Sequence, residues 1–267
     1  MISKRVAIVT GASSGMGEAL SEDLVDRGWQ VAMADIQNNA ELTSKLGDNA
    51  TFHYCDVADY DIQAKAFQEV WDRYGRLDAL CANAGIVDKS SIFILDHKDS
   101  DKIPPKPNLL CTDIDYKGVV YGTQLAIHFM RKNTTPGGSI VATSSCAAVM
   151  PHETYPEYDG AKAANENIRI NCILPGLVAT KIIPPEVVAA VSPECMTPLS
   201  TIVSGYSKCL EDESLVGQAL EASAEKLLIV PQPELQNGRV SKRSVTVWDP
   251  LFRMYHGEPS QLPDAIS

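Results

Sequence analysis

The sequence has 267 residues, of which 45% are hydrophobic and 21% charged, and it carries a formal net charge of −11 at pH 7. This length suits one sizeable hydrophobic core and predicts a single domain, while the acidic balance argues against a nucleic-acid or anionic-membrane surface, which needs clustered Lys and Arg. The seven cysteines are odd in number and form no Cys-x-x-Cys pair, so we expect neither a disulfide framework nor a zinc site.

The N-terminus enters an apolar run at residues 6–9 shortly after Met1, which leaves no room for a signal peptide. No apolar run in the sequence approaches membrane-spanning length. We therefore expect a soluble, cytoplasmic protein with no membrane partner.

Short apolar runs then alternate with longer segments whose apolar residues recur every three or four positions. This alternation predicts an α/β fold in one domain over residues 1–267, with a doubly wound parallel sheet covered by helices on both faces. We expect strands at residues 5–10, 30–35, 51–55, 77–81, 139–143, 168–174 and 218–222, and helices at residues 15–27, 59–74 and 113–132.

Three segments lack this periodicity. Residues 88–108 are rich in Asp, Lys and Pro, which predicts an exposed excursion between the fourth strand and the next helix. Residues 182–210 and 230–267 contain many prolines and no clear period. We expect them to form a substrate-side lid and a C-terminal tail.

A glycine-rich turn, Thr10-Gly-Ala-Ser-Ser-Gly-Met-Gly17, lies between the first strand and the first helix. Because glycines let the backbone approach a pyrophosphate and a helix N-terminus offers free N–H groups, the turn predicts a Rossmann-type dinucleotide site; a tight loop without a ligand is the alternative. Asp35 ends the second strand, where a carboxylate can bind the adenosine ribose hydroxyls and repel a 2′-phosphate, which predicts NAD rather than NADP. The predicted cofactor-binding residues of this region are Gly11, Ser13, Ser14, Gly15, Met16, Gly17, Asp35 and Ile36.

A second constellation lies in the middle of the chain. Tyr158 and Lys162 are four residues apart, so on a helix they share one face, and the ammonium favours the phenolate. Ser145 lies thirteen positions before Tyr158. This arrangement predicts a proton-transfer site, although a solvated helix face can produce the same Tyr-x-x-x-Lys pattern.

Three further motifs complete a resemblance to the short-chain dehydrogenase/reductase family. They are Cys55-Asp56-Val57 after the third strand, Asn83-Ala84-Gly85 after the fourth, with Ala82 in place of the family's first Asn, and Pro175-Gly176 followed by Val178 and Thr180. The C-terminal half is most similar to the 15-hydroxyprostaglandin dehydrogenase-like group, especially its fungal members.

This resemblance implies that the protein interconverts a secondary alcohol and a ketone with NAD. It implies that Tyr158 is the general acid/base, that Lys162 favours the tyrosinate and holds the nicotinamide ribose, and that Ser145 hydrogen-bonds the reacting oxygen. With few basic residues near the site, we expect a lipophilic small-molecule alcohol or ketone. The resemblance adds to the cofactor-binding set Asp56, Val57, Asn83, Ala84, Gly85, Tyr158, Lys162, Pro175, Gly176, Val178 and Thr180.

Two side chains that lie between Ser145 and Tyr158 in the sequence each have two possible roles. Tyr155 either shapes the substrate pocket or packs as an ordinary aromatic residue, and His152 either touches the substrate or lies on the surface. The five histidines of the chain show no ligand spacing, so we predict no metal site.

Asp115 is one departure from the family. The family has an Asn at this position, in an N-x-x-G motif that ends here at Gly118. A carboxylate can accept a hydrogen bond from water or pair with Lys162, but it cannot donate as an amide does. We therefore group Asp115 with the catalytic residues Ser145, Tyr158 and Lys162 and predict reduced or pH-shifted activity.

The second departure is a short connection after Lys162. Only residues 163–167 separate it from Ile168, where the family has roughly fifteen more residues, about four helical turns. The six steps from Lys162 to Ile168 span at most about 20 Å, the length of one strand, so the helix must end early or the sixth strand must begin late.

Two interpretations of this shortening stay open. In one, residues 182–210 cover the gap and the protein is an NAD-dependent alcohol dehydrogenase or ketone reductase. In the other, it is a catalytically impaired NAD-binding or scaffold protein. Because the family's oligomer interface uses the missing stretch, whether the chain forms a homo-oligomer also stays open.

Overall fold

The computed structural model forms two compact units, Met1–Val230 and Pro231–Ser267, where the sequence predicts one domain with a C-terminal tail. The residues that the structure describes are 4–87, 97, 99–145, 170–231, 237–246, 248–257, 259 and 265–266.

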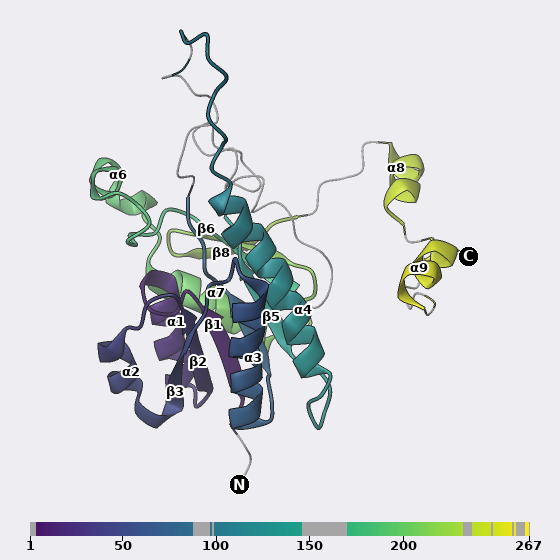
Figure 1. Cartoon of the computed structure of the whole chain (residues 1–267), viewed down its shortest axis with the longest axis horizontal. Helices are drawn as coiled ribbons and strands as arrows, with labels where there is room; N and C mark the ends of the chain where they lie inside the picture. Colours follow the sequence, from purple (N-terminus) through teal and green to yellow (C-terminus); the bar gives the residue numbers. More distant parts are fainter. Residues whose placement is uncertain are drawn as a thin grey trace. The chain divides into compact units, whose positions relative to one another are not determined.

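The first unit is built on one eight-stranded sheet with the order β3-β2-β1-β4-β5-β6-β7-β8 (Figure 1). Neighbouring strands are parallel except for β7 and β8, which pair antiparallel at one edge. The predicted doubly wound parallel sheet is therefore confirmed, and its direction of winding reverses between β1 and β4. The strands are β1 (Val6–Thr10), β2 (Gln30–Asp35), β3 (Ala50–Tyr54), β4 (Ala79–Ala82), β5 (Ser139–Thr143), β6 (Ile170–Pro175), β7 (Ala219–Ser223) and β8 (Lys226–Ile229).

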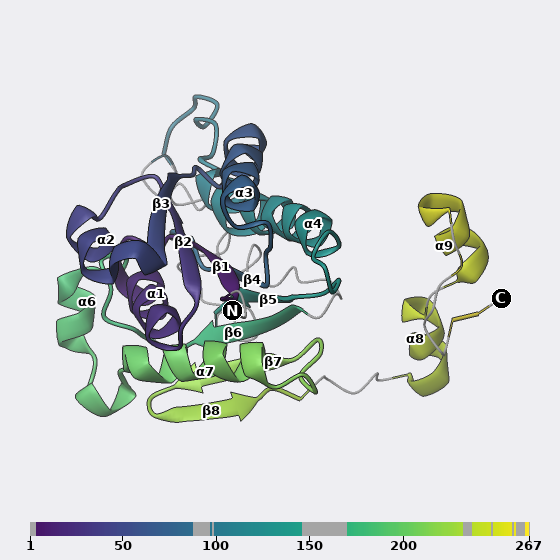
Figure 2. The ribbon, with the colours of Figure 1, turned by 90° about the horizontal axis from the view of Figure 1, so that it is seen from below.

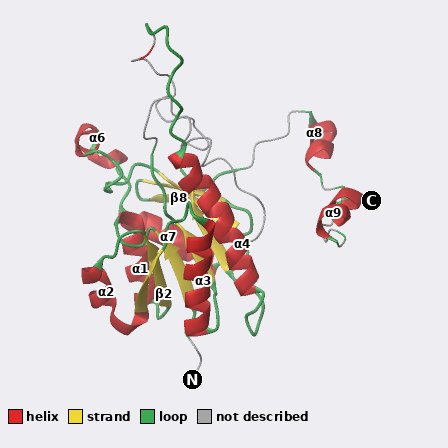
Figure 3. Ribbon diagram, in the orientation of Figure 1, coloured by secondary structure: helices red, strands yellow, loops and turns green. Residues whose placement is uncertain are grey.

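Helices cover both faces of this sheet (Figures 2 and 3). Three of them, α1 (Gly15–Asp26), α2 (Ala40–Leu46) and α7 (Leu199–Glu211), pack on one face, while α3 (Tyr60–Tyr74) and α4 (Gly118–Met130) pack on the other. Shorter elements are η1 (Gly47–Asn49), the π-helical turn η3 (Thr112–Lys117), α6 (Pro185–Ala190) and η5 (Pro193–Cys195).

The two covered faces explain why the central strands are apolar throughout. Every residue of β1, β4 and β5 is buried, as expected for parallel strands that lie between two helical layers. The cluster on the α1 face includes Leu20, Met33 and Ile202, and the cluster on the α3 and α4 face includes Phe67 and Phe129. Each helical layer thus has its own hydrophobic core.

Local capping residues set the ends of α3 close to where the sequence predicts them. The Asp59 side chain accepts a hydrogen bond from the Ile62 backbone N–H at 3.0 Å, which caps the first turn. At the other end, Gly75 adopts a left-handed conformation with φ +64°, which glycine takes without a steric penalty. These two signals confine the helix to fifteen residues.

Helix α7 corrects two predictions about residues 182–210. Ile202, Tyr206 and Cys209 are fully buried at helical spacing, so this helix belongs to the core, and only the part before Leu199 remains for a lid. α7 also packs against α1, on the face opposite α4. It therefore does not cover the face where a right-handed connection from β5 to β6 would lie.

The placement of α7 gives its crossover an unusual hand. The connection from β4 to β5 and the connection from β6 to β7 run in the same direction across the sheet, but α4 and α7 lie on opposite faces. The β6-α7-β7 unit therefore has the opposite hand to β4-α4-β5, an exception to the rule for parallel strands.

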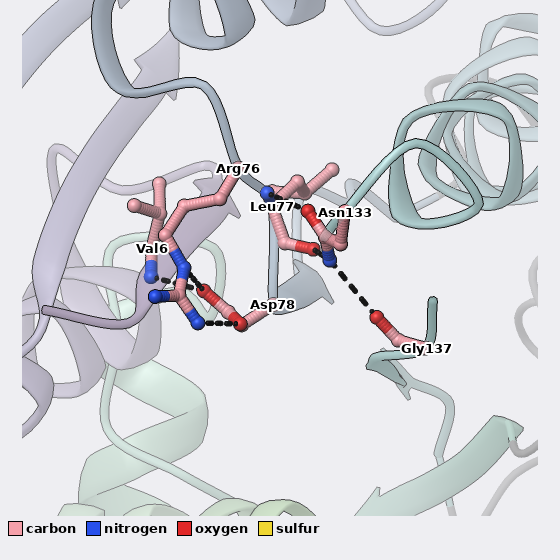
Figure 4. Close-up of polar contacts among 6 residues, drawn as sticks. All are labelled: Val6, Arg76, Leu77, Asp78, Asn133 and Gly137. Carbon is pink, nitrogen blue, oxygen red and sulfur yellow. Dashed lines mark hydrogen bonds and ion pairs between the residues drawn. The ribbon is translucent and has the colours of Figure 1, made fainter. Parts of the chain in front are cut away.

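Side chains link neighbouring strands at the end of the sheet where β1 and β4 begin (Figure 4). Asp78 accepts a hydrogen bond from the Val6 backbone N–H at 2.8 Å and pairs with the Arg76 guanidinium through contacts of 2.8 and 2.6 Å. Hydrogen bonding to Asp78 and its charge raise the pKa of Arg76. This pair fixes the start of β1 against the start of β4.

Asn133 links the segment before β5 to the segment before β4 (Figure 4). Its Oδ1 accepts from the Leu77 backbone N–H at 3.0 Å, and its Nδ2 donates to the Leu77 carbonyl at 2.7 Å and the Gly137 carbonyl at 3.0 Å. The side chain is 9% exposed. One amide thus replaces the backbone partners that a neighbouring strand would supply.

The second unit contains two short helices, α8 (Gly238–Val245) and α9 (Asp249–His256). The Asp249 backbone N–H donates to the Ile266 carbonyl at 2.7 Å, beside a parallel bridge between Trp248 and Ile266. α9 ends at Gly257, which has φ +76°. Within the described ranges of both units, no helix is long and apolar enough to cross a membrane, and no group of three or more His, Cys, Asp or Glu could hold a metal ion.

Candidate functional site

The glycine-rich turn between β1 and α1 has a shape that only glycine permits. Gly11 and Gly15 have φ values of +64° and +58°, a region that L side chains rarely adopt. A Cβ at Gly11 would lie 2.9 Å from the Ala84 Cα, and one at Gly17 would lie 2.1 Å from the Gly11 carbonyl oxygen. Helix α1 begins here without a side-chain cap from Ser14, so its first N–H groups are suited to an anion.

Asp35 ends β2 beside this turn, as the sequence predicts. Its two carboxylate oxygens accept hydrogen bonds from the backbone N–H groups of Ser13 and Gln37, each at 3.0 Å. These bonds orient the carboxylate and leave it further acceptor sites. The next residue, Ile36, is 57% exposed, whereas Met16 on α1 packs against the core.

The predicted segment after β3 is shaped by its own backbone. Cys55 and Val57 are buried, and Asp56 Oδ1 accepts a hydrogen bond from the Ala58 N–H at 3.0 Å. Burial, and secondarily the negative charge of Asp56, raise the pKa of the Cys55 thiol to about 12. This cysteine is therefore a protonated core residue at neutral pH.

Asn83 joins the turn to the strands on the other side of the switch point. Its Nδ2 donates to the carbonyls of Thr10 at 3.1 Å and Gly11 at 3.4 Å, and its Oδ1 accepts from the Thr143 hydroxyl at 3.2 Å. The backbone N–H groups of Asn83 and Ala84 both donate to Thr10 Oγ1 at 3.0 Å. One amide therefore fixes the carboxyl ends of β1, β4 and β5 relative to each other.

Tyr206 of α7 extends this network, and the sequence analysis missed it. Its hydroxyl forms a short hydrogen bond with Thr143, so the chain of bonds runs from α7 through Thr143 and Asn83 to the glycine turn. Burial raises the pKa of Tyr206, so the phenol stays protonated. No local sequence signal could have found it, because the contact depends on where α7 docks.

Ala82, where the family has Asn, lies in the apolar cluster beneath α4. A cavity of about 10 Å³ is lined there by Ala82, Thr10 and Gln63. The Gln63 amide donates to the carbonyls of Val57 at 3.0 Å and Gly118 at 3.3 Å, and its buried Oε1 has no hydrogen-bond partner among the described residues. This small cavity therefore lies next to a buried acceptor.

The segment after β6 returns to the glycine turn. The Gly176 N–H donates to the Ala222 carbonyl at 2.8 Å, which extends the pairing of β6 with β7. A Cβ on Gly176 would lie 2.7 Å from the Thr197 hydroxyl. Further along, the Thr180 methyl lies 3.2 Å from the position that a Cβ on Gly15 would occupy. Pro175 and Val178 are buried in the same segment.

Asp115 lies beside the Asn83-Ala84-Gly85 turn, in the π-helical turn that precedes α4. It is 2% exposed, and its Oδ1 accepts a hydrogen bond from the Ile86 N–H at 2.9 Å. Such π-helical turns occur often at functional sites. The sequence analysis predicted an ordinary helix here, and the structure adds that the carboxylate supports the turn that follows β4.

The catalytic residues predicted on the other side of the site are described only in part. Ser145 lies two residues after the end of β5 and is half-buried, and the N–H of the neighbouring Ser144 donates to the Ile173 carbonyl at 2.8 Å. Tyr158 and Lys162 lie outside the described residues, as do His152 and Tyr155. The structure thus brings together the cofactor-side residues, Asp115 and Ser145 at the carboxyl ends of the strands.

The chain is similar to several known proteins. The profile of the family described as short chain dehydrogenase matches residues 5–187. The short-chain dehydrogenase/reductase prx6 of Penicillium rubens is 51% identical over 290 residues, covering 98% of this chain and 97% of the relative. The 15-hydroxyprostaglandin dehydrogenase (NAD(+)) of Homo sapiens is 32% identical over 205 residues, covering 68% of this chain and 71% of the relative.

A solved structure shares the fold. The 3-ketoacyl-(acyl-carrier-protein) reductase from Brucella melitensis complexed with NADH has a TM-score of 0.68 at 19% identity, over 84% of this chain and 98% of that chain. The alignment with prx6 also bears on chain length, because its 290 positions exceed the 267 residues of this chain. That relative therefore contains residues with no counterpart here.

Proposed function

The chain belongs to the short-chain dehydrogenase/reductase family, whose members are oxidoreductases, and on this basis we propose that it is an NAD-dependent oxidoreductase that interconverts a secondary alcohol and a ketone. The observation that carries the choice of NAD is Asp35, which two backbone N–H groups hold at the end of β2. A carboxylate in this position can accept hydrogen bonds from two ribose hydroxyls and repels a 2′-phosphate. Relatives named as NAD(+) enzymes point the same way.

The residues around the turn fit a dinucleotide. Gly11, Gly15 and Gly17 leave bare backbone where a side chain would collide with the turn or its neighbours. The uncapped start of α1 suits the pyrophosphate, and Asp35 suits the adenosine ribose. The NAD, when bound, supplies the hydride acceptor at its nicotinamide ring. The segment from Pro175 to Thr180 would hold the nicotinamide end, because Thr180 lies against the turn.

The protein's own part in the reaction is to place and move a proton. In the proposed mechanism Tyr158 takes the hydroxyl proton of the alcohol, Lys162 favours the ionised phenol, and Ser145 donates a hydrogen bond to the reacting oxygen. Ser145 follows Ser144, whose backbone N–H donates to the Ile173 carbonyl just after the end of β5. Asp115, at 2% exposure, supplies a carboxylate where the family has an amide.

We propose a lipophilic alcohol or ketone as the substrate. The described cofactor-side residues include no Lys or Arg that would recognise a phosphorylated or acidic substrate. Apolar pockets with a few placed polar groups are the usual sites for such ligands.

The proposal is tested by titrating the purified protein with NADH and then following turnover of a panel of secondary alcohols and ketones at the nicotinamide absorbance. We expect NADH binding and turnover that falls at least about a hundredfold in Tyr158→Phe, since general acid/base catalysis contributes about that much. The matched control is Tyr54→Phe, a phenol that is 57% exposed on β3, which should leave turnover unchanged. Binding without turnover on any panel member would contradict the proposed activity and favour a non-catalytic NAD-binding protein.

A further inference from the structure

Ser13 is connected to the β2–α2 segment by all of its polar groups. Its backbone N–H donates to Asp35 Oδ2 at 3.0 Å, its hydroxyl donates to the Gln37 carbonyl, and its own carbonyl accepts from Asn39 Nδ2 at 3.1 Å. The residue is 9% exposed. The glycine turn is therefore bound to the loop that carries Asp35 by bonds that do not involve a ligand.

The Asn39 side chain contacts both the start of α2 and the glycine turn. Its Oδ1 accepts from the Leu42 N–H at 3.0 Å and caps α2, while its Nδ2 donates to the Ser13 carbonyl. The amide orientation is fixed, because the Leu42 N–H requires the oxygen and the Ser13 carbonyl requires the nitrogen. A residue with only acceptors could cap the helix but could not hold Ser13.

We propose that Asn39 is a positioning residue for the adenosine half of the dinucleotide. It holds Ser13, Ser13 holds the carboxylate of Asp35, and Asp35 faces the ribose hydroxyls. This inference rests on the proposed NAD binding and extends it to a residue outside the glycine turn. Fixing these groups before binding lowers the ordering cost of association, so releasing them weakens affinity without removing any contact to the ligand.

The test compares Asn39→Ser with Asn38→Ser. Serine is as good an N-cap as asparagine, so Asn39→Ser keeps the cap of α2 but lacks the amide donor. Asn38 is the matched control, because among the described residues its side chain makes one exposed hydrogen bond, accepted from Thr43 at 3.4 Å. We expect Asn39→Ser to raise the dissociation constants of AMP and NADH about five- to tenfold and Asn38→Ser to leave both unchanged.

Hydrogen exchange of the free proteins provides a readout that does not depend on any ligand. In Asn39→Ser the peptide that contains Ser13 should exchange faster, while peptides of α3 and α4 should exchange as in the wild type. Unchanged AMP affinity, or faster exchange throughout the first unit, would overturn the inference, since it would show no effect or a general loss of structure. A wild-type chain that binds neither AMP nor NADH would instead refute the proposed function, and the inference with it.

Discussion

Replacing Asn133 with Ala tests whether a single side-chain amide stabilises the end of the sheet where β4 and β5 begin. The substitution removes three hydrogen bonds and leaves the N–H and carbonyl of Leu77, next to β4, without their side-chain partner. A buried polar group that loses its partner costs about 1–3 kcal/mol, so we expect the free energy of unfolding to fall by about 3 kcal/mol. For a unit of this size, that corresponds to a melting temperature lower by about 6–12 °C.

The assay is urea unfolding followed by tryptophan fluorescence. Asn133→Asp keeps the acceptor for Leu77 but directs a second oxygen at two carbonyls, so it should be destabilised at least as much as Asn133→Ala. The control is Asn108→Ala, an exposed residue that accepts from the Leu110 N–H at 2.9 Å, for which we expect a change within about 0.5 kcal/mol. A loss below about 1 kcal/mol for Asn133→Ala would refute the argument, because it would show that water or backbone shifts satisfy Leu77.

Two further predictions concern Asp115 and Cys55. In Asp115→Asn the side chain can still accept the hydrogen bond from the Ile86 N–H, and it regains the amide donor that the family has. We expect kcat to rise about tenfold, which is equivalent to one hydrogen bond of about 1.4 kcal/mol, and the pH profile of kcat to shift. An equal or lower kcat in a stable variant would contradict this prediction. Burial raises the pKa of Cys55 to about 12, so its contribution to stability is complete below about pH 9 and is lost as the pH rises towards 12, at about 1.4 kcal/mol per pH unit. Urea unfolding between about pH 9 and 11 should therefore show a shallower decline for Cys55→Ala than for wild type, and equal slopes would count against the assignment.

The family and the order of the main elements could be predicted because their signals are local. Apolar runs bounded by turn residues locate the seven predicted strands, with ends shifted by no more than two positions. Caps such as Asp59 and Gly75 locate the helix ends. β8 was missed because it has only four residues and follows β7 through a turn at Ala224, which has φ +47° and no glycine.

Features that depend on tertiary packing could not be predicted in this way. The apolar residues of α7 are separated by Ser, Thr and Gly, so the helix became apparent only where Ile202 and Tyr206 meet α1 and the sheet. The β6-α7-β7 crossover also lacks the right-handedness that is usual for parallel strands, so the face on which α7 packs could not be predicted. Helix α7 packs on the face of α1, so it does not support the prediction that residues 182–210 cover a gap left after Lys162.

In the candidate site, too, features with a local sequence signal could be predicted, and features that depend on tertiary packing could not. The glycine turn and Asp35 were located from sequence because each has a local pattern, the glycine spacing after β1 and a carboxylate at the end of β2, although distant residues such as Asn83 hold them in the fold. The link from Tyr206 through Thr143 to Asn83 joins three distant segments, and the π-helical turn around Asp115 depends on packing against the turn after β4. The roles of Tyr158 and Lys162 stay predictions, since both lie outside the described residues.

The antiparallel strand β8 also affects how the molecule behaves at high concentration. An outermost strand offers unpaired backbone groups to which another chain can add, and Leu228 and Ile229 are 47% and 54% exposed here. Three features limit such growth: the strand has four residues, it begins with the charged Lys226, and Pro231, which has no N–H, follows shortly after its end. The edge of the sheet is therefore protected against aggregation by the shortness of β8, by Lys226 and by the proline that follows, although three of the four side chains of β8 are apolar.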